Sequence, residues 1–438
     1  MLDGFKKLAG GFSLLKSKEM PIAIDFGASA LKVLQVGGTC PPTPENNLGH
    51  PVVPPTLDKD GKPVFDPPNL IAAACLETPD NLLADPMRRL DYQFEHLARV
   101  IREGGFRGKR VVCSIPSAQT FCKTLQLTKA DGVAVPDMVA AAIPEHFGCD
   151  PSALVYRLID VSVPGAPANR MEVICIGVGR EFVDMLMKRL KAAKLEPVGL
   201  QSQFAATMRV MDGLRKRQGD EHMTSLYLDI GASTTKLMIA HGTKLAFAKT
   251  IDIGGRHLDE TVARQLKISL KEARQERVEA ERRAEEIAGA EEKRAPVAVG
   301  AGAETSSDGD GRVKLGLDER RAREAKITLL ASLVACPEGA SLAEPLEIFA
   351  DEIAMCLRYH ESLFPGRKVD GLVFTGGEAR HRGLCQHLAR FLRMPAQIAD
   401  PIARVARTGK EPTTGVDFNI PQPGWVVPLG LCFSPTDL

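Results

Sequence analysis

Two short stretches of the chain combine a carboxylate, glycine, small hydroxyl residues and a lysine in the same order. Residues 25–32 read Asp-Phe-Gly-Ala-Ser-Ala-Leu-Lys, and residues 229–236 read Asp-Ile-Gly-Ala-Ser-Thr-Thr-Lys. A tight turn of this composition presents backbone N–H groups to a phosphate, and a carboxylate at a strand end holds magnesium directly or through water. The two stretches together predict one phosphate chain clamped between two related halves.

The residues of these two turns are the first candidate ligands. Asp25 and Asp229 would hold Mg²⁺ through water, although a buried aspartate at a strand end can instead cap its turn. Lys32 and Lys236 follow in each hairpin, and Lys236 either reaches phosphate or stays solvated. Backbone and hydroxyl donors would wrap the phosphates; these belong to Gly27, Ala28, Ser29, Gly231, Ala232, Ser233, Thr234 and Thr235.

A third motif joins a short apolar strand to a pair of glycines. Residues 371–378 read Gly-Leu-Val-Phe-Thr-Gly-Gly-Glu, and a helix is expected after them. Glycines at such a turn let the backbone approach a flat ring or a sugar closely, although the same turn also serves as a plain tight connection. We expect Gly376, Gly377 and Glu378 to border an adenosine, and Gly254 and Gly255 to border its sugar.

Apolar periodicity sets out the elements that must position these motifs. We expect helices over residues 91–103, 137–147, 181–194, 258–266, 344–362 and 383–392. Strands are expected, besides the two hairpins, over residues 111–115, 121–127, 154–163, 171–178, 245–253 and 371–375. Residues 37–69 are rich in Pro and Gly and predict a loop, with at most one weak strand pair near Val52 and Val64.

These elements suggest four segments. We expect a basic, amphipathic tail over residues 1–20, a first half over 21–115, an inserted α+β unit over 116–198 and a second half over 199–438. The tail would form either a frayed end or a short interfacial helix. Within the second half, the charged stretch 272–294 predicts a solvated helix and residues 295–312 a disordered loop, together an irregular region of about 272–325.

Composition excludes several classes of protein. The formal net charge of +1 gives no electrostatic reason to expect nucleic acid as a partner. The ten cysteines include no Cys-x-x-Cys pair, which favours reduced thiols in a cytosolic protein. No apolar run approaches the roughly 20 residues that a membrane-spanning helix needs, so we expect no crossing of a bilayer.

The order of motifs resembles that of the actin-like ATPases. These proteins share two phosphate loops and a later adenosine loop on a duplicated α/β, ribonuclease-H-like fold with a nucleotide cleft between its halves. Within that superfamily the chain looks most like the PilM family of type IV pilus assembly, a relative of FtsA. Three further stretches carry this resemblance, at residues 111–127, 251–258 and 267–273.

The resemblance implies ATP and Mg²⁺ as ligands and a role as a cytosolic scaffold. The inserted unit and the cleft beside it would receive the short cytosolic tail of an inner-membrane pilus protein, so the chain would associate with that membrane peripherally, through its partner. Self-association is a further possibility in this superfamily. No nucleic acid is expected.

Two departures from the actin-like pattern bear on catalysis. Ala30 stands where these proteins often carry a hydroxyl residue, and the stretch that usually supplies a water-activating residue holds only Gln201 and Gln203. A glutamine amide can orient water but cannot act as a general base as a carboxylate does. We therefore expect tight ATP binding with slow or absent turnover, unless both glutamines are ordinary polar surface.

Two other function classes stay open. A sugar- or acetate-kinase-like phosphotransferase would use the same duplicated fold, but residues 70–200 contain no aspartate in a recognisable sugar-kinase motif. An FtsA-like filament-forming protein is the other alternative, although the chain ends in Phe-Ser-Pro-Thr-Asp-Leu rather than in an amphipathic helix.

Overall fold

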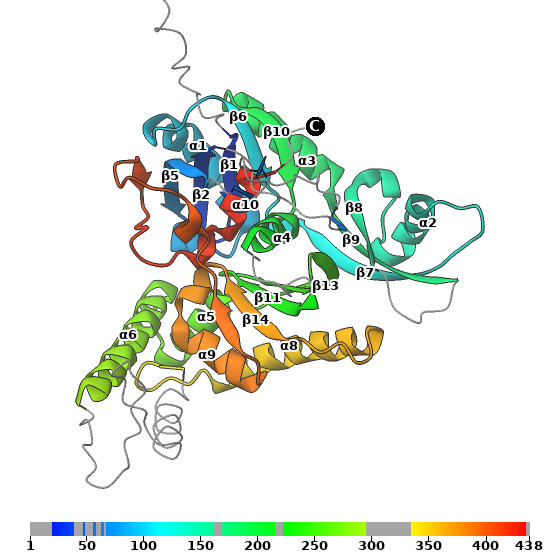
Figure 1. The fold of residues 1–438 in the computed structure, drawn as a ribbon. Coiled ribbons are helices and arrows are strands. Elements are labelled where there is room, and N and C mark those ends of the chain that lie inside the picture. The colour runs from blue at the N-terminus through cyan, green and yellow to red at the C-terminus, as the bar shows by residue number, and fades with distance from the viewer. Residues whose placement is uncertain are drawn as a thin grey trace, which may run out of the picture.

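Two β-sheets with the same internal strand order form the body of the molecule in the computed structural model (Figure 1). The structure describes residues 20–38, 47–48, 56–57, 63–64, 67–161, 169–214, 222–294 and 334–434. The first sheet runs β10-β6-β1-β2-β5-β16 and the second runs β13-β12-β11-β14-β15. The first comprises β1 (Ile22–Phe26), β2 (Ala30–Gly37), β5 (Asn69–Glu77), β6 (Arg110–Ser114), β10 (Glu196–Gln201) and β16 (Thr413–Thr414).

The second sheet repeats the pairing of the first. It comprises β11 (Thr224–Ile230), β12 (Thr235–His241), β13 (Lys244–Ile251), β14 (Gly371–Thr375) and β15 (Ala396–Ile398). In both sheets the leading strand pairs antiparallel with its hairpin partner on one side and parallel with a later strand on the other. This repetition confirms the predicted duplicated actin-like fold, which the comparisons below also support.

Alternation along the strands explains why helices cover both faces of the sheets. In β11, Leu226, Leu228 and Ile230 enter the core under α5 (Gly255–Leu266), α8 (Ala343–Leu363) and α9 (Arg382–Phe391). Tyr227 points to the opposite face, where a second core joins the two sheets. Successive side chains of a strand point to opposite faces, so a strand that is buried on both sides is apolar throughout.

Two helices from distant parts of the chain fill the space between the sheets. These are α4 (Gln203–Leu214) and α10 (Val426–Cys432), which pack on each other and on β1 and β2 (Figure 1). At their contact, a Cβ atom on Gly430 would overlap the carbonyl oxygen of Ala206. On the outer face of the first sheet lie α1 (Pro86–Glu103) and α3 (Arg180–Ala192).

The inserted unit is a three-stranded sheet with a helix and a core of its own. Its strands β7 (Phe121–Thr128), β8 (Leu154–Val161) and β9 (Arg170–Gly179) take the order β7-β9-β8, and α2 (Val135–Phe147) covers them. We expected this unit to run to residue 198. In the structure, Leu186 and Leu190 of α3 pack against β1, and β10 pairs with β6, so this part of the chain belongs to the first sheet.

Strand β5 is an element that the periodicity did not predict. Its core, Leu-Ile-Ala-Ala-Ala-Cys-Leu, is a continuous apolar run without alternation, and such runs do not distinguish a buried strand from a helix. The strand is central to the site because Thr78, directly after it, donates its backbone N–H to Ser29.

The Pro-rich segment contributes a short strand pair and one buried contact. Strand β3 (Thr56–Leu57) pairs with β4 (Pro63–Val64), which contains Val64 of the expected strand pair, while Val52 lies outside the described residues. Asn47 donates to the carbonyls of Asp160 at 3.0 Å and Leu245 at 2.8 Å, and accepts from the Leu245 N–H at 2.9 Å. It thereby joins β8 of the inserted unit to β13 of the second half.

The charged stretch forms α6 (Leu270–Arg294). We expected a solvated helix, but one face of it is buried. Ala273 and Arg277 are buried, because this face of the helix packs on α5 and the second sheet. The expected tail over residues 1–19 and the expected disordered loop at 295–312 lie outside the described residues. Among the helices of the described ranges, none has both the length and the apolarity that crossing a membrane requires.

Candidate functional site

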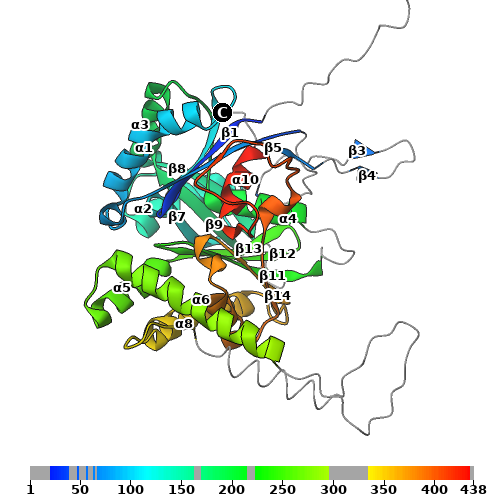
Figure 2. The same cartoon turned by 90° about the vertical axis from the view of Figure 1, so that its left-hand side faces the viewer.

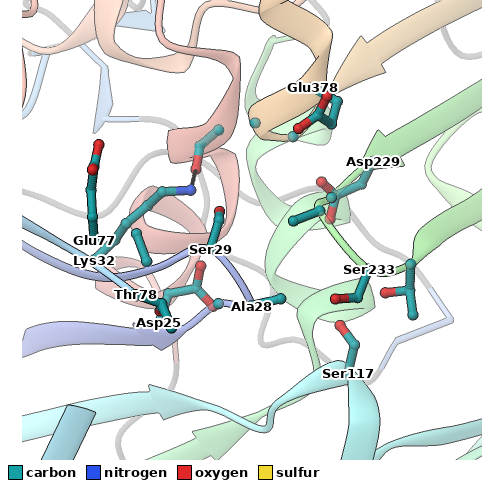
Figure 3. Close-up of a pocket in the computed structure, with 18 of the residues that line it drawn as sticks. Asp25, Ala28, Ser29, Lys32, Glu77, Thr78, Ser117, Asp229, Ser233 and Glu378 are labelled. Carbon is teal, nitrogen blue, oxygen red and sulfur yellow. Dashed lines mark hydrogen bonds between the residues drawn. The ribbon is translucent and has the colours of Figure 1, made fainter. Parts of the chain in front are cut away.

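A cleft of about 740 Å³ lies between the two halves, and both hairpin turns line it (Figure 3). Ligand-binding cavities commonly have volumes of roughly 300–1,000 Å³. Of the expected site residues, the lining includes Asp25, Gly27, Ala28, Ser29, Lys32, Gln203, Asp229, Gly231, Ala232, Ser233, Thr234, Lys236, Gly376, Gly377 and Glu378. The structure thus brings together residues as far apart in the chain as Asp25 and Glu378, which are 353 positions apart.

In the first turn, Asp25 is held by two neutral donors. Its Oδ1 atom accepts from the Ser114 hydroxyl at 2.7 Å and from the Gln203 side-chain amide at 2.9 Å. Gln203 is only 5% exposed, and its Oε1 accepts from the Ser117 hydroxyl at 2.7 Å. Gln203 is therefore a buried part of the cleft, not ordinary surface, whereas Gln201 ends β10 and does not line the cleft.

In the second turn, Asp229 is held by a charged donor. Lys236, its partner across the hairpin, places Nζ 3.0 Å from Asp229 Oδ2, and both side chains are less than a tenth exposed. Lys236 is therefore neither solvated nor free. The equivalent Lys32 faces Asp25 in the hairpin register, but its Nζ donates to the Gly424 carbonyl at 2.7 Å (Figure 3).

Gly254 and Gly255 lie behind the second turn and not along the cleft. The backbone N–H of Gly255 donates to the Gly231 carbonyl at 3.1 Å, and a Cβ on Gly254 would overlap that same carbonyl oxygen. The Thr235 hydroxyl donates to the Ile253 carbonyl and is likewise absent from the cleft lining. These three residues shape the turn that would hold phosphate, so the structure does not place Gly254 and Gly255 where we expected a sugar.

The Gly-Gly motif after β14 brings the backbone against the second turn. Gly376 has φ of +92°, and a Cβ there would overlap the Ile230 carbonyl and crowd Asp229 Oδ1 at 2.6 Å. Gly377 has open space on its α-carbon and lines the cleft. The requirement for glycine at position 376 is thus both conformational and steric.

Glu378 is tied down by charges that the sequence motif did not reveal. Arg277 of α6 donates to Glu378 Oε2 at 2.9 Å and to Asp259 Oδ1 at 2.6 Å, and all three side chains are at most 6% exposed. Burial opposes ionisation of Glu378, but Arg277 and His381 hold its pKa below the usual value. For Asp259, burial outweighs Arg277 and raises the pKa. Glu378 therefore fastens α6 to the cleft wall as well as lining it.

Helix α6 supplies a cleft wall that sequence reasoning missed. Lys271, Arg274, Val278 and Glu281 line the cleft, and their spacing of three or four residues puts them on one helix face. Val278 is 43% exposed there, and His381 Nδ1 lies 2.5 Å from Glu281. The spacing of these four residues is visible in the sequence. It did not indicate a binding face, because most other residues of the helix are charged as well.

The residues present fit a magnesium–phosphate ligand whose metal is held through water. Within the described ranges no group of three His, Cys, Asp or Glu side chains is close enough to enclose a metal. Asp25 lies with Ser29 on one side of the cleft, and Asp229 and Ser233 lie on the other side (Figure 3). Mg²⁺ in nucleotide sites commonly keeps several waters and uses one or two carboxylates together with phosphate oxygens, which this arrangement can provide.

Two protein families match parts of the chain. The family model of type IV pilus assembly protein PilM matches residues 72–285, and that of cell division protein FtsA matches residues 226–415. Together the two matches extend over the inserted unit, the second hairpin turn and the second sheet, while the first hairpin turn lies outside both. A search among curated proteins found no match.

Solved structures with this fold include a PilM-PilN type IV pilus biogenesis complex. It is 18% identical with a TM-score of 0.62, and the match covers 94% of this chain and 97% of that one. The ethanolamine utilization protein EutJ from Carboxydothermus hydrogenoformans is 14% identical, with a TM-score of 0.41 and coverage of 95% and 89%. MreB 5 of Spiroplasma citri bound to AMPPNP is 13% identical, with a TM-score of 0.38 and coverage of 87% and 93%.

Proposed function

We propose that the chain, which has the actin-like fold and resembles PilM and FtsA over parts of its length, is an ATP-binding scaffold of type IV pilus assembly. The observation that carries this proposal is the cleft, in which two equivalent hairpin turns and a Gly-Gly turn converge between the halves. Each part supports a different portion of a nucleoside triphosphate.

The phosphates would lie between the two hairpin turns. Backbone N–H groups and hydroxyls of residues 27–29 and 232–234 line that space and can donate to phosphate oxygens, while the Gly231 N–H closes the second turn by donating to the Thr234 carbonyl. Asp25 and Asp229 would hold Mg²⁺ through its water ligands, and the metal would neutralise phosphate charge. Lys32 and Lys236 line the same space and add positive charge.

The adenosine would lie between Gly377 and the cleft face of α6. Val278 offers an exposed apolar side chain against which a base can pack, while Arg274 lies one turn before it and Lys271 two turns before it. Gly377 carries no side chain to obstruct the ring, since its α-carbon faces open space. The Glu378–Arg277 pair would keep this wall at a constant distance from the phosphate loops.

Slow turnover is the expected behaviour of this cleft. Gln203 is the cleft residue placed to orient water, yet its amide group already donates to Asp25 and accepts from Ser117. An amide cannot take a proton from water as a carboxylate can, so Gln203 gives no general base. We propose that the protein holds ATP for long periods and uses the bound state as a signal.

The partner would be the short cytosolic tail of an inner-membrane pilus protein. The related fold seen in a PilM-PilN complex supports this choice. The tail would bind at the inserted unit or in the groove beside it, and binding would bring the chain to the membrane surface. Co-purification with that tail, in buffers with and without ATP, tests this; absence of a complex under both conditions would remove the partner from the proposal.

Calorimetry of nucleotide binding tests the cleft itself. We expect the folded protein to bind ATP with magnesium at micromolar or lower Kd. Asp229→Asn should raise that Kd by about tenfold or more, because a charge-assisted contact to hydrated metal is lost. Asp252→Asn, a change of an exposed aspartate in the same half, is the matched control. If the folded wild-type protein bound neither ATP nor ADP, the proposed function would be wrong.

A further inference from the structure

A buried arginine lies at one end of the cleft without an acidic partner. Arg89, in the first turn of α1, is 6% exposed and lines the cleft. Its Nη1 donates to the carbonyl of Leu83 at 2.8 Å, and none of the ion pairs among the described residues includes Arg89. The nearest acid that acts on it is Asp85, whose Oδ1 is already engaged with the backbone N–H groups of Met87 and Arg88.

A second arginine, from the opposite half, points to the same carbonyl. Arg256 at the start of α5 donates Nη1 to Leu83 at 3.1 Å, so two guanidinium groups share one neutral acceptor. Arg256 has an acidic neighbour of its own, since its Nε lies 3.0 Å from Glu260. Arg89 therefore carries the excess positive charge, and burial together with Arg256 lowers its pKa.

The segments that carry the two arginines are bonded to the phosphate loops. One turn after Arg89, Gln93 donates to the Gly27 carbonyl at 2.9 Å, and Thr78 beside it donates its N–H to Ser29. The backbone N–H of Arg256 donates to the Ala232 carbonyl at 2.8 Å. The excess charge is thus fixed next to the place where the end of a phosphate chain would lie.

We propose that Arg89 is a phosphate-binding residue of the cleft, which pairs with the terminal phosphate of ATP or with free inorganic phosphate beside ADP. This rests on the nucleotide cleft proposed above and adds to it a means of telling ATP from ADP. A buried charge without a partner is costly, and a phosphate dianion in the cleft supplies the missing counter-charge.

The carboxylates on the same wall of the cleft do not neutralise the charge of Arg89. Glu77 and Asp80 also line this end of the cleft, but neither forms an ion pair with Arg89 in the described parts of the chain. Glu77 is exposed, so solvent screens its charge. The guanidinium fork suits bidentate binding of phosphate, which a lysine ammonium does not reproduce.

The test compares ATP and ADP binding, each with magnesium, by calorimetry in wild type and Arg89→Gln. We expect Arg89→Gln to raise the Kd of ATP about tenfold or more and that of ADP less than twofold, since only ATP has the terminal phosphate. Arg88→Gln, a change of the exposed neighbouring arginine, should change neither. Arg89→Lys should restore only part of the ATP affinity.

A second measurement separates binding from folding. Inorganic phosphate should raise the melting temperature of the wild-type ADP complex and of Arg88→Gln, but not that of Arg89→Gln. Without ligand, Arg89→Gln should melt at the same or a higher temperature, because a buried charge without a partner is removed and Arg256 still donates to Leu83.

The outcomes distinguish this inference from the proposed function. Equal losses of ATP and ADP affinity in Arg89→Gln, or equal stabilisation of both proteins by phosphate, would overturn it while leaving the nucleotide cleft in place. A wild-type protein that binds no nucleotide would contradict the proposed function; phosphate titration of the ligand-free protein would then still decide whether Arg89 binds the anion.

Discussion

At the scale of single residues, the two phosphate loops hold equivalent aspartates with different partners. Asp25 accepts from a hydroxyl and an amide, whereas Asp229 pairs with a lysine. Neutral donors leave the full negative charge of Asp25 in the cleft, while Lys236 offsets that of Asp229. We infer that Asp25 exerts the stronger pull on the hydrated metal, even though the sequence of the second loop looks more complete.

The Gly-Gly turn after β14 gives a prediction at this scale. Gly376→Ala should abolish nucleotide binding, because its Cβ would collide with the Ile230 carbonyl and Asp229 Oδ1. Gly366→Ala is the control, since it has a similar φ of +80° and no atom within 4 Å of the added Cβ. In both variants the alanine must adopt a positive φ, which lowers the free energy of unfolding by about 1–2 kcal/mol. Only Gly376→Ala should lose ATP binding in calorimetry, and equal ATP binding by the two would contradict the packing described.

At the scale of elements, α6 depends on one buried ion cluster for its position. Replacing Arg277 with Met leaves Asp259 buried without its ion-pair partner and leaves Glu378 with only the more distant His381, at 3.6 Å. Breaking a buried pair in this way typically costs about 3–5 kcal/mol. We expect a loss of that order in urea unfolding, and a smaller loss at pH 5 than at pH 8 because protonation removes the stranded charge.

An exposed arginine of the same helix provides the control for this change. Arg283 pairs with Glu279 on the solvent side, with 61% of its side chain exposed. Exposed pairs within a helix contribute well under 1 kcal/mol, so Arg283→Ala should leave the unfolding free energy almost unchanged. Similar losses for the two variants would mean that α6 is not held by the buried cluster.

The junction of β12 and α8 predicts a dependence of stability on pH. Nε2 of His241 lies 2.8 Å from Nε2 of His360, a hydrogen bond in which one ring donates its N–H and the other must be neutral to accept it, so both rings cannot be protonated at once. Burial, with Arg367 nearby, lowers the pKa of each to about 4 from 6.5. The unfolded chain binds protons at these histidines below pH 6.5 and the folded one does not, so stability should fall from pH 6.5 towards 4.

Substitution of both histidines by glutamine checks this directly. Urea unfolding at pH 7 and pH 5 should show a smaller difference for the double variant than for wild type. His222→Gln, a change of an exposed histidine, should keep the wild-type difference. A double variant with an undiminished difference would assign the pH dependence to other groups.

The sequence allowed the hairpins, most helices and the duplicated fold to be predicted, because each depends on local periodicity and turn chemistry. It did not reveal β5, whose alanine-rich run has no period, or the cleft face of α6, where Val278 is the one apolar contact among charges. Gln203 and Arg89 illustrate the remaining limit. Both look like surface residues in the sequence, and their burial arises from segments that are distant in the chain.

At the scale of the whole molecule, the inserted unit is joined to both halves. Strands β8 and β9 contact α3 of the first half, and both Figure 1 and Figure 2 show β8 close to α3. Strands β7 and β8 also contact β13 of the second half. Asn47 adds three hydrogen bonds to that contact: its side-chain amide donates to one carbonyl in β8 and one in β13, and its side-chain oxygen accepts from a backbone N–H of β13.

Asn47 should therefore control how freely the inserted unit moves. Asn47→Ala should increase amide hydrogen exchange at Leu245 and in β8, because the Leu245 N–H loses its acceptor. We expect a stability loss of about 1–3 kcal/mol. Asn419→Ala, at an exposed loop position, is the control. Unchanged exchange in β8 and β13 would show that strand contacts alone hold the unit.

Helix α10 has a consequence for the order in which the chain can fold. Residues 426–432 complete the core under β1 and β2, which are synthesised about four hundred residues earlier. While it is being made on the ribosome, the first sheet therefore exposes an apolar face that no preceding segment can cover. The first half would need protection by a chaperone until release, and a fragment that ends before α10 would aggregate rather than fold.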